Sequence, residues 1–260
     1  MEVIVLSEVS ERAALAADAI ADLLRRKPSA VLGLATGSSP LPVYDALVAL
    51  YDAGEVSFAQ ARAFTLDEYV GLPAGHPQAY RQVIDRELAS RVDFAPGAVR
   101  GPNGDTDDVP AACTQYESDI ESAGGVDVQL LGIGSDGHLA FNEPGSSLAS
   151  RTRVKTLTPQ TRADNARFFG HPDDVPRHVI TQGLGTILQA RHLVLLASGG
   201  GKAAAVAAMV EGPVSASCPG SVLQLHPHVT VLLDAAAAGE LRLREYYDQV
   251  WRGKPAWQGI

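Results

Sequence analysis

The stretch VDVQLLGIGSDGHLAFNEP, residues 126–144, carries the pattern that decides the fold class of this chain. Its first part, 126–133, is nearly continuous in apolar residues, which is typical of a strand covered on both faces. Glycines follow at once, and Asp136, His138 and Glu143 stand among or just after them. In open α/β sheets, ligands bind beyond the carboxyl ends of the strands. The stretch therefore predicts an α/β protein with a functional loop at this strand end.

The same alternation of apolar runs and helical segments extends over the whole chain. Strands are expected at 3–6, 30–35, 61–66, 126–133, 192–197 and 229–234. Helices are expected at 10–26, 40–53, 77–90, 107–122, 180–190, 202–211 and 235–252. Strands that alternate with helices indicate a mainly parallel sheet. We therefore expect an open α/β fold, a modified Rossmann-like architecture with helices on both faces of the sheet.

The composition of the 260 residues narrows the class of partner. The net charge of −9 argues against a nucleic-acid-binding protein, although local lysines, arginines and backbone N–H groups can still hold a small anion. Two cysteines, Cys113 and Cys218, are too few for a disulfide framework and favour a reducing compartment. The N-terminus lacks a signal-peptide pattern, and no segment approaches the ~18 uncharged apolar residues of a membrane span. We expect a soluble, cytoplasmic protein with no nucleic-acid or membrane partner.

Two further loops at strand ends are suited to an anion. In ATGSSP (35–40), hydroxyl and backbone N–H groups would lie at the start of a helix, where phosphate binds readily; the residues are Thr36, Gly37, Ser38 and Ser39. In SGGGK (198–202), three glycines allow a ligand to approach closely, and Lys202 stands where it opposes the helix dipole. The alternatives are an ordinary turn with Ser39 as the N-cap and a solvated surface lysine.

Acid–base chemistry is indicated at two strand ends. Asp67 and Glu68 follow the strand 61–66, where one could serve as a general base or cap the following turn. Asp136 beside His138 would favour the imidazolium and fix its tautomer, so the pair could exchange a proton with a sugar or acyl oxygen. The group offers too few ligands for a secure metal site. A buried structural histidine is the alternative for His138.

The segment 158–178, TPQTRADNARFFGHPDDVPRH, departs from the α/β pattern. It is polar, flanked by prolines and rich in arginine, with two adjacent phenylalanines. Long irregular segments are uncommon in compact domains unless they are functional. The segment is therefore either a lid over the site or a plain surface excursion.

Four strings together resemble the glucosamine-6-phosphate deaminases, in the order found in that family. They are FTLDEYVGL (64–72), GIGSDGHLAFNEPGSSLASRTRVKTLT (132–158), TRADNARFF (161–169) and LQLHPH (223–228). The string SDGHLAFNEP is highly specific, whereas ATGSSP is shared with other sugar-phosphate proteins. The resemblance covers the whole chain, so we expect one domain over 1–260 with its lid near 158–178. It implies the conversion of glucosamine 6-phosphate and water to fructose 6-phosphate and ammonia, in amino-sugar catabolism.

The resemblance also implies a role for each catalytic residue. His138, oriented by Asp136 and Glu143, would open the sugar ring. Asp67 would carry a proton from C2 to C1 through an enolamine, and the ketimine left at C2 would lose ammonia to water. The amine of the substrate supplies the electron sink, so no metal, flavin or pyridoxal cofactor is expected. The family's phosphate ligands correspond to Thr36, Gly37, Ser38, Ser39 and Lys202, and to Arg167 from the lid.

The string GSSLASRTRVKTLT (145–158) resembles the branch of the family that N-acetylglucosamine 6-phosphate activates at a subunit interface. The residues that match that site are Ser146, Arg153, Lys155 and Thr156. The family also places a tyrosine there from near the C-terminus, which Tyr246 or Tyr247 could match. The likeness implies a homo-oligomer, with a hexamer favoured. A strand with a solvated basic face is the alternative.

Two other classes of protein share parts of this pattern. A 6-phosphogluconolactonase resembles this fold and has the same DGH turn, but it continues differently, so LAFNEP (139–144) favours a deaminase. A sugar-phosphate-sensing regulator would carry a DNA-binding helix-turn-helix ahead of the domain. Such a sensor would not need Asp67, Asp136, His138 and Glu143 together. The sequence therefore predicts an enzyme.

Overall fold

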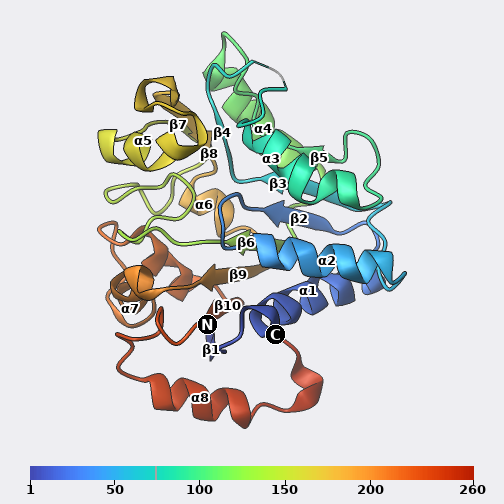
Figure 1. Ribbon diagram of the computed structural model, residues 1–260, viewed down its shortest axis with the longest axis vertical. Helices are drawn as coiled ribbons and strands as arrows, with labels where there is room; N and C mark the ends of the chain where they lie inside the picture. The colour runs from blue at the N-terminus through green and yellow to red at the C-terminus, as the bar shows by residue number, and fades with distance from the viewer. Residues whose placement is uncertain (74) are drawn as a thin grey trace.

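The computed structural model describes residues 1–73 and 75–260, and only the backbone at residues 160, 164, 167, 172 and 256. Within these residues, seven strands form a central sheet in the order β1-β10-β9-β6-β2-β3-β5, and every neighbouring pair is parallel. The strands are β1 (Glu2–Val5), β2 (Val31–Leu34), β3 (Arg62–Thr65), β5 (Val99–Arg100), β6 (Val128–Leu131), β9 (His192–Ala197) and β10 (Val229–Leu233) (Figure 1). The expected open, mainly parallel α/β sheet is confirmed.

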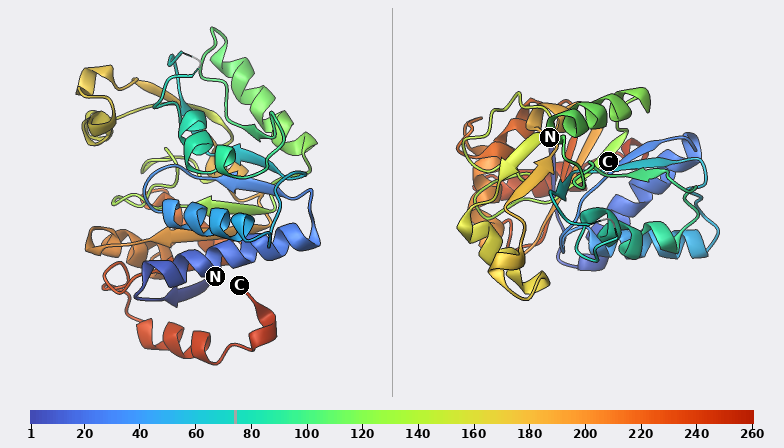
Figure 2. Two further views of the ribbon diagram at one scale, coloured as in Figure 1. Left: turned by 45° about the vertical axis from the view of Figure 1, so that its right-hand side comes forward. Right: turned by 90° about the horizontal axis from the view of Figure 1, so that it is seen from above.

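The two longest strands, β9 and β10, are buried along their whole length because helices cover both faces of the sheet. Along β9, Leu193 and Leu195 belong to the core on one face, whereas Val194 and Leu196 belong to the core on the other. The first face is covered by α4 (Val109–Ser122), α6 (Leu184–Ile187) and α7 (Ala203–Glu211), and the second by α1 (Val9–Arg26), α2 (Leu41–Asp52) and α3 (Tyr80–Glu87) (Figure 2). Removing both faces from water stabilises the fold. Among the described helices, none has the length and apolar content that a bilayer span requires.

Two of the expected helices are wrong in part. Residues 180–190 hold the end of a strand, β8 (His178–Thr181), and only a four-residue helix, α6. The strand forms because it has antiparallel partners on both sides, β4 (Asp67–Tyr69) and β7 (Arg153–Thr156). The helix expected at 235–252 begins only at α8 (Arg244–Arg252). Asp234 instead closes a turn, in which its Oδ1 accepts the N–H of Ala237 at 2.7 Å.

The strand order places a reversal of direction between β2 and β6. From β2 the chain moves outward through β3 to β5, then returns to β6 beside β2 and moves the other way through β9 to β10. Where the crossovers diverge in this way, the loops after the two adjacent strands open a crevice at the carboxyl edge of the sheet. The loops here are 35–40 and 132–138, and the sequence predicts a functional role for both.

β4, β8 and β7 form a second, antiparallel sheet, and the segment 158–178 follows β7. This segment contains α5 (Pro159–Asn165) and lies with β7 and β8 at one corner of the molecule, in yellow in Figure 1. Thr158 caps the helix, because its Oγ1 accepts the N–H of Thr161 at 3.1 Å. The assignments of this segment as a lid and of 1–260 as one domain stay predictions.

A stacked histidine pair predicts loss of stability in acid. The rings of His192 and His228 lie parallel at 3.7 Å, and Nε2 of His192 is 2.9 Å from Oγ1 of Thr230. Burial, and secondarily the charge of His228, lowers the pKa of His192 to about 3. The unfolded chain takes up this proton below its ordinary pKa of about 6.5, so folding should lose about 2 kcal/mol between pH 7.5 and pH 5 through this residue.

Chemical denaturation at the two pH values checks this prediction. In His192→Gln the fall in unfolding free energy between pH 7.5 and pH 5 should shrink by about 2 kcal/mol. In His171→Gln, which removes an exposed histidine, it should match the wild type. Equal pH dependence in all three proteins would show that His192 does not stay neutral in the folded state.

Candidate active site

Four loops meet at the carboxyl edge of the central sheet. They follow β9, β6, β2 and β3, which are consecutive in the sheet. Ser39 Oγ lies 3.7 Å from where a Cβ on Gly132 would stand, so the loops after β2 and β6 are in contact. Burial lowers the pKa of the Lys202 ammonium, and the neighbouring Asp136 carboxylate partly opposes this shift, so the loop after β9 reaches the same place. The structure thus brings the sequence-predicted loops after β2, β6 and β9 together, and the segment after β3 begins at the same edge of the sheet.

His138 is oriented by its own loop. Its Nδ1 lies 2.6 Å from Oδ1 of Asp136, and the same oxygen accepts the backbone N–H of His138 at 3.2 Å. The N–H of Gly134 donates to the carbonyl oxygen of His138 at 2.9 Å, and a Cβ at position 134 would lie 2.2 Å from the imidazole ring. The Asp136 carboxylate therefore lies against Nδ1, which leaves Nε2 as the ring atom for proton exchange with a substrate.

Glu143 has a different partner from the one the sequence suggested. Its Oε1 accepts a hydrogen bond from Oγ1 of Thr161 at 2.7 Å, which ties α5 to this carboxylate. The carboxylate that contacts the imidazole of His138 is that of Asp136. An orienting role of Glu143 toward His138 therefore stays a prediction. In the described part of the chain, no group of three or more histidine, cysteine, aspartate or glutamate side chains could hold a metal ion.

Asp67 and Glu68 are adjacent in β4 but have different surroundings. Glu68 caps α3, because its carboxylate accepts the N–H groups of Tyr69, Tyr80 and Arg81 at 2.8, 2.9 and 2.9 Å. Asp67 is 5% exposed, and within the described residues its Oδ1 has no hydrogen-bond partner. Burial, and secondarily the charge of Glu68, raises the pKa of Asp67 to about 8. A carboxyl group with such a pKa is suited to proton transfer near neutral pH.

The loop 35–40 is not closed by a cap of its own. In this fully described segment, Pro40 occupies the N-cap position of α2 and no side chain caps the first turn, so Ser39 is not the N-cap considered above. Gly37 has a φ of +93°, a conformation that favours glycine. Thr36 is half-buried and Ser38 is exposed. The loop is thus consistent with a phosphate site, and its role in binding stays a prediction.

The glycine loop that ends at Lys202 is anchored where it begins. Nη2 of the buried Arg12 donates to Oγ of Ser198 at 3.2 Å. Lys202 itself is half-buried beside the Asp136 loop. Arg167 lies in a short 3₁₀ helix of the segment 158–178, and its side chain is outside the described part of the structure.

The residues expected at an effector site lie on β7 and in the loop before it. Arg153 and Lys155 are half-buried, Thr156 is exposed, and Ser146 is buried. Burial lowers the pKa of Arg153. The tyrosines at 246 and 247 lie on α8, which packs beside β1 at the opposite end of the molecule from β7 (Figure 1). A single chain therefore does not bring these tyrosines to β7.

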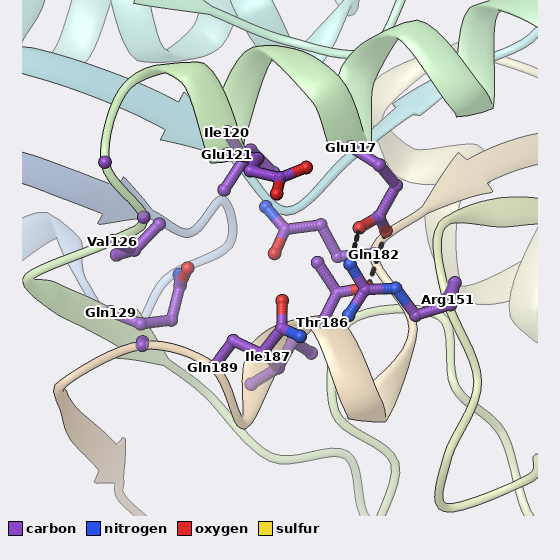
Figure 3. A pocket seen from close by; sticks show the side chains of 13 residues that line it. Glu117, Ile120, Glu121, Val126, Gln129, Arg151, Gln182, Thr186, Ile187 and Gln189 are labelled. Atoms are coloured by element: carbon purple, nitrogen blue, oxygen red, sulfur yellow. Dashed lines mark hydrogen bonds and ion pairs between the residues drawn. The ribbon is translucent and has the colours of Figure 1, made fainter.

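A separate cavity of about 400 Å³ lies between α4, α6 and β6 (Figure 3). Gln129 and Gln182 are in its lining, and Arg151 forms an ion pair there with Glu117. Gln182 also contacts the backbone that precedes Asp67. Sequence reasoning missed the two glutamines, because a single buried polar residue leaves no periodic signal.

A family model described as glucosamine-6-phosphate isomerases/6-phosphogluconolactonase matches residues 7–232. The chain belongs to this family. The glucosamine-6-phosphate deaminase of Mycolicibacterium smegmatis is 68% identical, and the alignment covers 100% of both chains. Proteins of the same name from Beutenbergia cavernae and Streptomyces coelicolor are 65% and 60% identical, again over the full length of both chains.

Solved structures agree with the fold. A structure described as a monomeric glucosamine-6-phosphate deaminase has a TM-score of 0.89 and 43% identity, and the alignment covers 92% of this chain and 100% of that one. A 6-phosphogluconolactonase from Trypanosoma cruzi has a TM-score of 0.72 at 22% identity, over 93% of this chain and 97% of that one. The second likeness shows a shared fold alone.

Proposed function

We propose that this member of the family is a glucosamine-6-phosphate deaminase of amino-sugar metabolism in the cytoplasm, which produces fructose 6-phosphate and ammonia. One observation carries the proposal. The buried carboxyl group of Asp67, on β4 just after β3, and the imidazole–carboxylate pair of His138 and Asp136, after β6, lie at the carboxyl edge of one sheet on either side of the loop after β2. Full-length relatives of that name at 60–68% identity support the same reading.

The first chemical step would be opening of the sugar ring. His138, whose Nδ1 lies 2.6 Å from Oδ1 of Asp136, would exchange a proton through Nε2 with the ring oxygen as the bond between that oxygen and C1 breaks. The anomeric hydroxyl loses its proton, and the aldehyde of the open chain forms. An imidazole serves both directions of this exchange because its ordinary pKa is near neutrality.

The second step would be isomerisation and loss of ammonia. Asp67 in its ionised form removes the hydrogen from C2, which gives an enolamine, and returns it to C1. The amine nitrogen is then doubly bonded to C2 as a ketimine. Water attacks C2, the C2–N bond breaks, ammonia leaves, and the ketone of fructose 6-phosphate remains. The residues that we propose for the phosphate are Thr36, Gly37, Ser38, Ser39, Lys202 and Arg167.

Direct assay of the purified protein tests the proposed function. Incubation with glucosamine 6-phosphate should release ammonia and fructose 6-phosphate in equal amounts. The alternative activity is hydrolysis of 6-phosphogluconolactone, which the shared fold permits. Hydrolysis of the lactone without any release of ammonia from the amino sugar would replace the proposal by that alternative.

The raised pKa of Asp67 predicts an acidic limb in the pH profile of kcat/KM. Because the base must be ionised, kcat/KM should fall about tenfold for each pH unit below about 8. Glu68→Gln removes the neighbouring negative charge, so the limb should move to lower pH. A limb that belongs to the substrate amine would not move, and a limb near pH 4 would contradict the burial effect on Asp67.

Allosteric activation and assembly are proposed on the residues of β7 and its preceding loop, Ser146, Arg153, Lys155 and Thr156. Since one chain keeps its C-terminal tyrosines far from β7, a site that uses both needs a second copy, and we propose a homo-oligomer, with a hexamer favoured. N-acetylglucosamine 6-phosphate should then lower the half-saturating substrate concentration. Arg153→Met should abolish this response. Sedimentation as a monomer, together with an unchanged saturation curve, would contradict both parts.

A further inference from the structure

Gln182 joins two parts of the site. It follows β8 directly and is 1% exposed. On one side its backbone N–H donates to the carbonyl oxygen of Leu66 at 2.8 Å, and its Nε2 donates to that of Thr65 at 3.0 Å. On the other side its carbonyl oxygen accepts Nδ2 of Asn142 at 2.8 Å. Leu139 and Asn142 form an antiparallel bridge, so residues 139–142 make a tight hairpin just after His138. The chain just before the buried carboxylate and this hairpin are therefore both bonded to Gln182.

Asp67 depends on its backbone for its position. Within the described residues its Oδ1 has no hydrogen-bond partner, whereas its carbonyl oxygen accepts Oγ1 of Thr65 at 3.2 Å. β4 also pairs Asp67 with Thr181, the residue before Gln182. A carboxylate that serves two adjacent carbons must reach both, and a displacement of about 1 Å can cost ~10²-fold in rate. Whatever fixes this backbone therefore fixes the proton transfer.

The carbonyl oxygen of Thr65 accepts hydrogen bonds from two separate parts of the chain. Besides Nε2 of Gln182, it accepts the hydroxyl of Tyr116 on α4 at 2.6 Å, and the Tyr116 side chain is 3% exposed. Two buried donors on one oxygen keep this peptide in a single orientation. The donors lie 51 and 117 positions after Thr65 along the chain, so neither follows from local sequence.

The hairpin on the other side needs equal restraint. Ala140 has a φ of +50°, which an L-residue with a Cβ adopts at a cost of about 1 kcal/mol. The hairpin is held in that conformation by the N–H of Phe141, which donates to Oγ1 of Thr181 at 3.2 Å, and by the bond of Asn142 to Gln182. The same two consecutive residues, Thr181 and Gln182, thus restrain both the hairpin and the base.

We infer that Gln182 is a positioning residue for proton transfer between C2 and C1. Its side-chain amide sets the reach of Asp67, and its carbonyl oxygen keeps the hairpin that follows His138 in register with that carboxylate. The inference rests on the proposed function, because it names the step that the geometry serves. This role goes beyond packing. A residue that merely filled the space would not need a side-chain donor to the carbonyl oxygen of Thr65, two residues before Asp67.

The test uses Gln182→Met, which keeps the length of the side chain and removes the donor to Thr65. With glucosamine 6-phosphate, kcat should fall about 10- to 100-fold while KM stays within about twofold, because misplacement of the base leaves the phosphate contacts in place. With substrate deuterated at C2, the isotope effect on kcat should rise, because proton transfer becomes rate-limiting. A buffer that merely stabilises the fold should not restore kcat in this variant.

Gln224→Met is the matched control. Nε2 of Gln224 donates to the carbonyl oxygens of Met209 and Gly212 at 2.7 and 2.9 Å, so the same substitution removes a comparable cross-link away from the loops of the site. It should lower Tm and leave the isotope effect unchanged. If Gln182→Met does not fold, Tyr116→Phe removes the other donor to Thr65 and should show the same pattern with a smaller loss of kcat.

The outcomes separate this inference from the proposed function. Should the wild type release no ammonia from glucosamine 6-phosphate, the proposed function fails first. With an active wild type, unchanged kcat and isotope effect in Gln182→Met overturn the inference and leave the function standing. A lower kcat with an unchanged isotope effect overturns it as well, since that result describes a structural role.

Discussion

Asp67→Asn is expected to lower kcat for deamination by about 10⁴-fold, the upper end of what general acid–base catalysis contributes. The amide has the shape of the carboxylate but cannot take the hydrogen from C2 or return it to C1. Asp67 is 5% exposed, so bulk water has little access to the position of the base. Substrate binding should survive, because the residues proposed for the phosphate lie on other loops.

Steady-state assay and binding by calorimetry check this result together. The variant should bind glucosamine 6-phosphate with a Kd within about threefold of the wild type, since it loses no charge-assisted contact to the phosphate. Asp108→Asn is the control, because Asp108 is the N-cap of α4 and asparagine caps a helix equally well. Continued exchange of the C2 hydrogen with solvent in Asp67→Asn would falsify the role of this carboxylate.

Gly134→Ala is expected to lower kcat by about 100-fold, because the new Cβ would lie 2.2 Å from the imidazole of His138 and must push the ring away. The backbone of Gly134 is not in the left-handed region, so alanine brings no conformational penalty that would confuse the result. The displaced ring would lose its 2.6 Å contact with Asp136 and its aim at the ring oxygen of the sugar.

Gly132→Ala is the matched control two residues earlier in the same loop. Its Cβ would meet Ser39 at 3.7 Å, an ordinary van der Waals contact, so kcat should stay near the wild-type value. Thermal unfolding of both variants shows whether either is destabilised. Wild-type kcat in Gly134→Ala would mean that the position of the His138 ring does not limit turnover.

Most of the central sheet could be predicted from the sequence because its strands are largely buried between two layers of helices. Each of the six expected strands is an apolar run, and each is present in the structure. The other four described strands, β4, β5, β7 and β8, were not predicted. In β7, for example, the exposed Val154 and Thr156 alternate with half-buried charged residues, and pairing with β8 makes this segment a strand.

At the site, the sequence could predict which loops are functional, but not which role each residue in a loop has. Asp67 and Glu68 are chemically similar neighbours, and only the start of α3 against Glu68 leaves Asp67 as the buried carboxyl group without such bonds. Likewise, Asp136 and Glu143 looked equivalent beside His138, until the position of α5 gave Glu143 a bond to Thr161.

By itself, the sequence determined the α/β class, the loops at the carboxyl edge and the family, because these depend on local hydrophobicity and on strings of neighbouring residues. The tertiary structure alone decided which carboxylate is desolvated and which is bonded. It also decided that Gln182 meets Thr65 across 117 positions of the chain. Desolvation and hydrogen bonding depend on what lies within a few ångströms in space, and separation along the sequence does not set that distance.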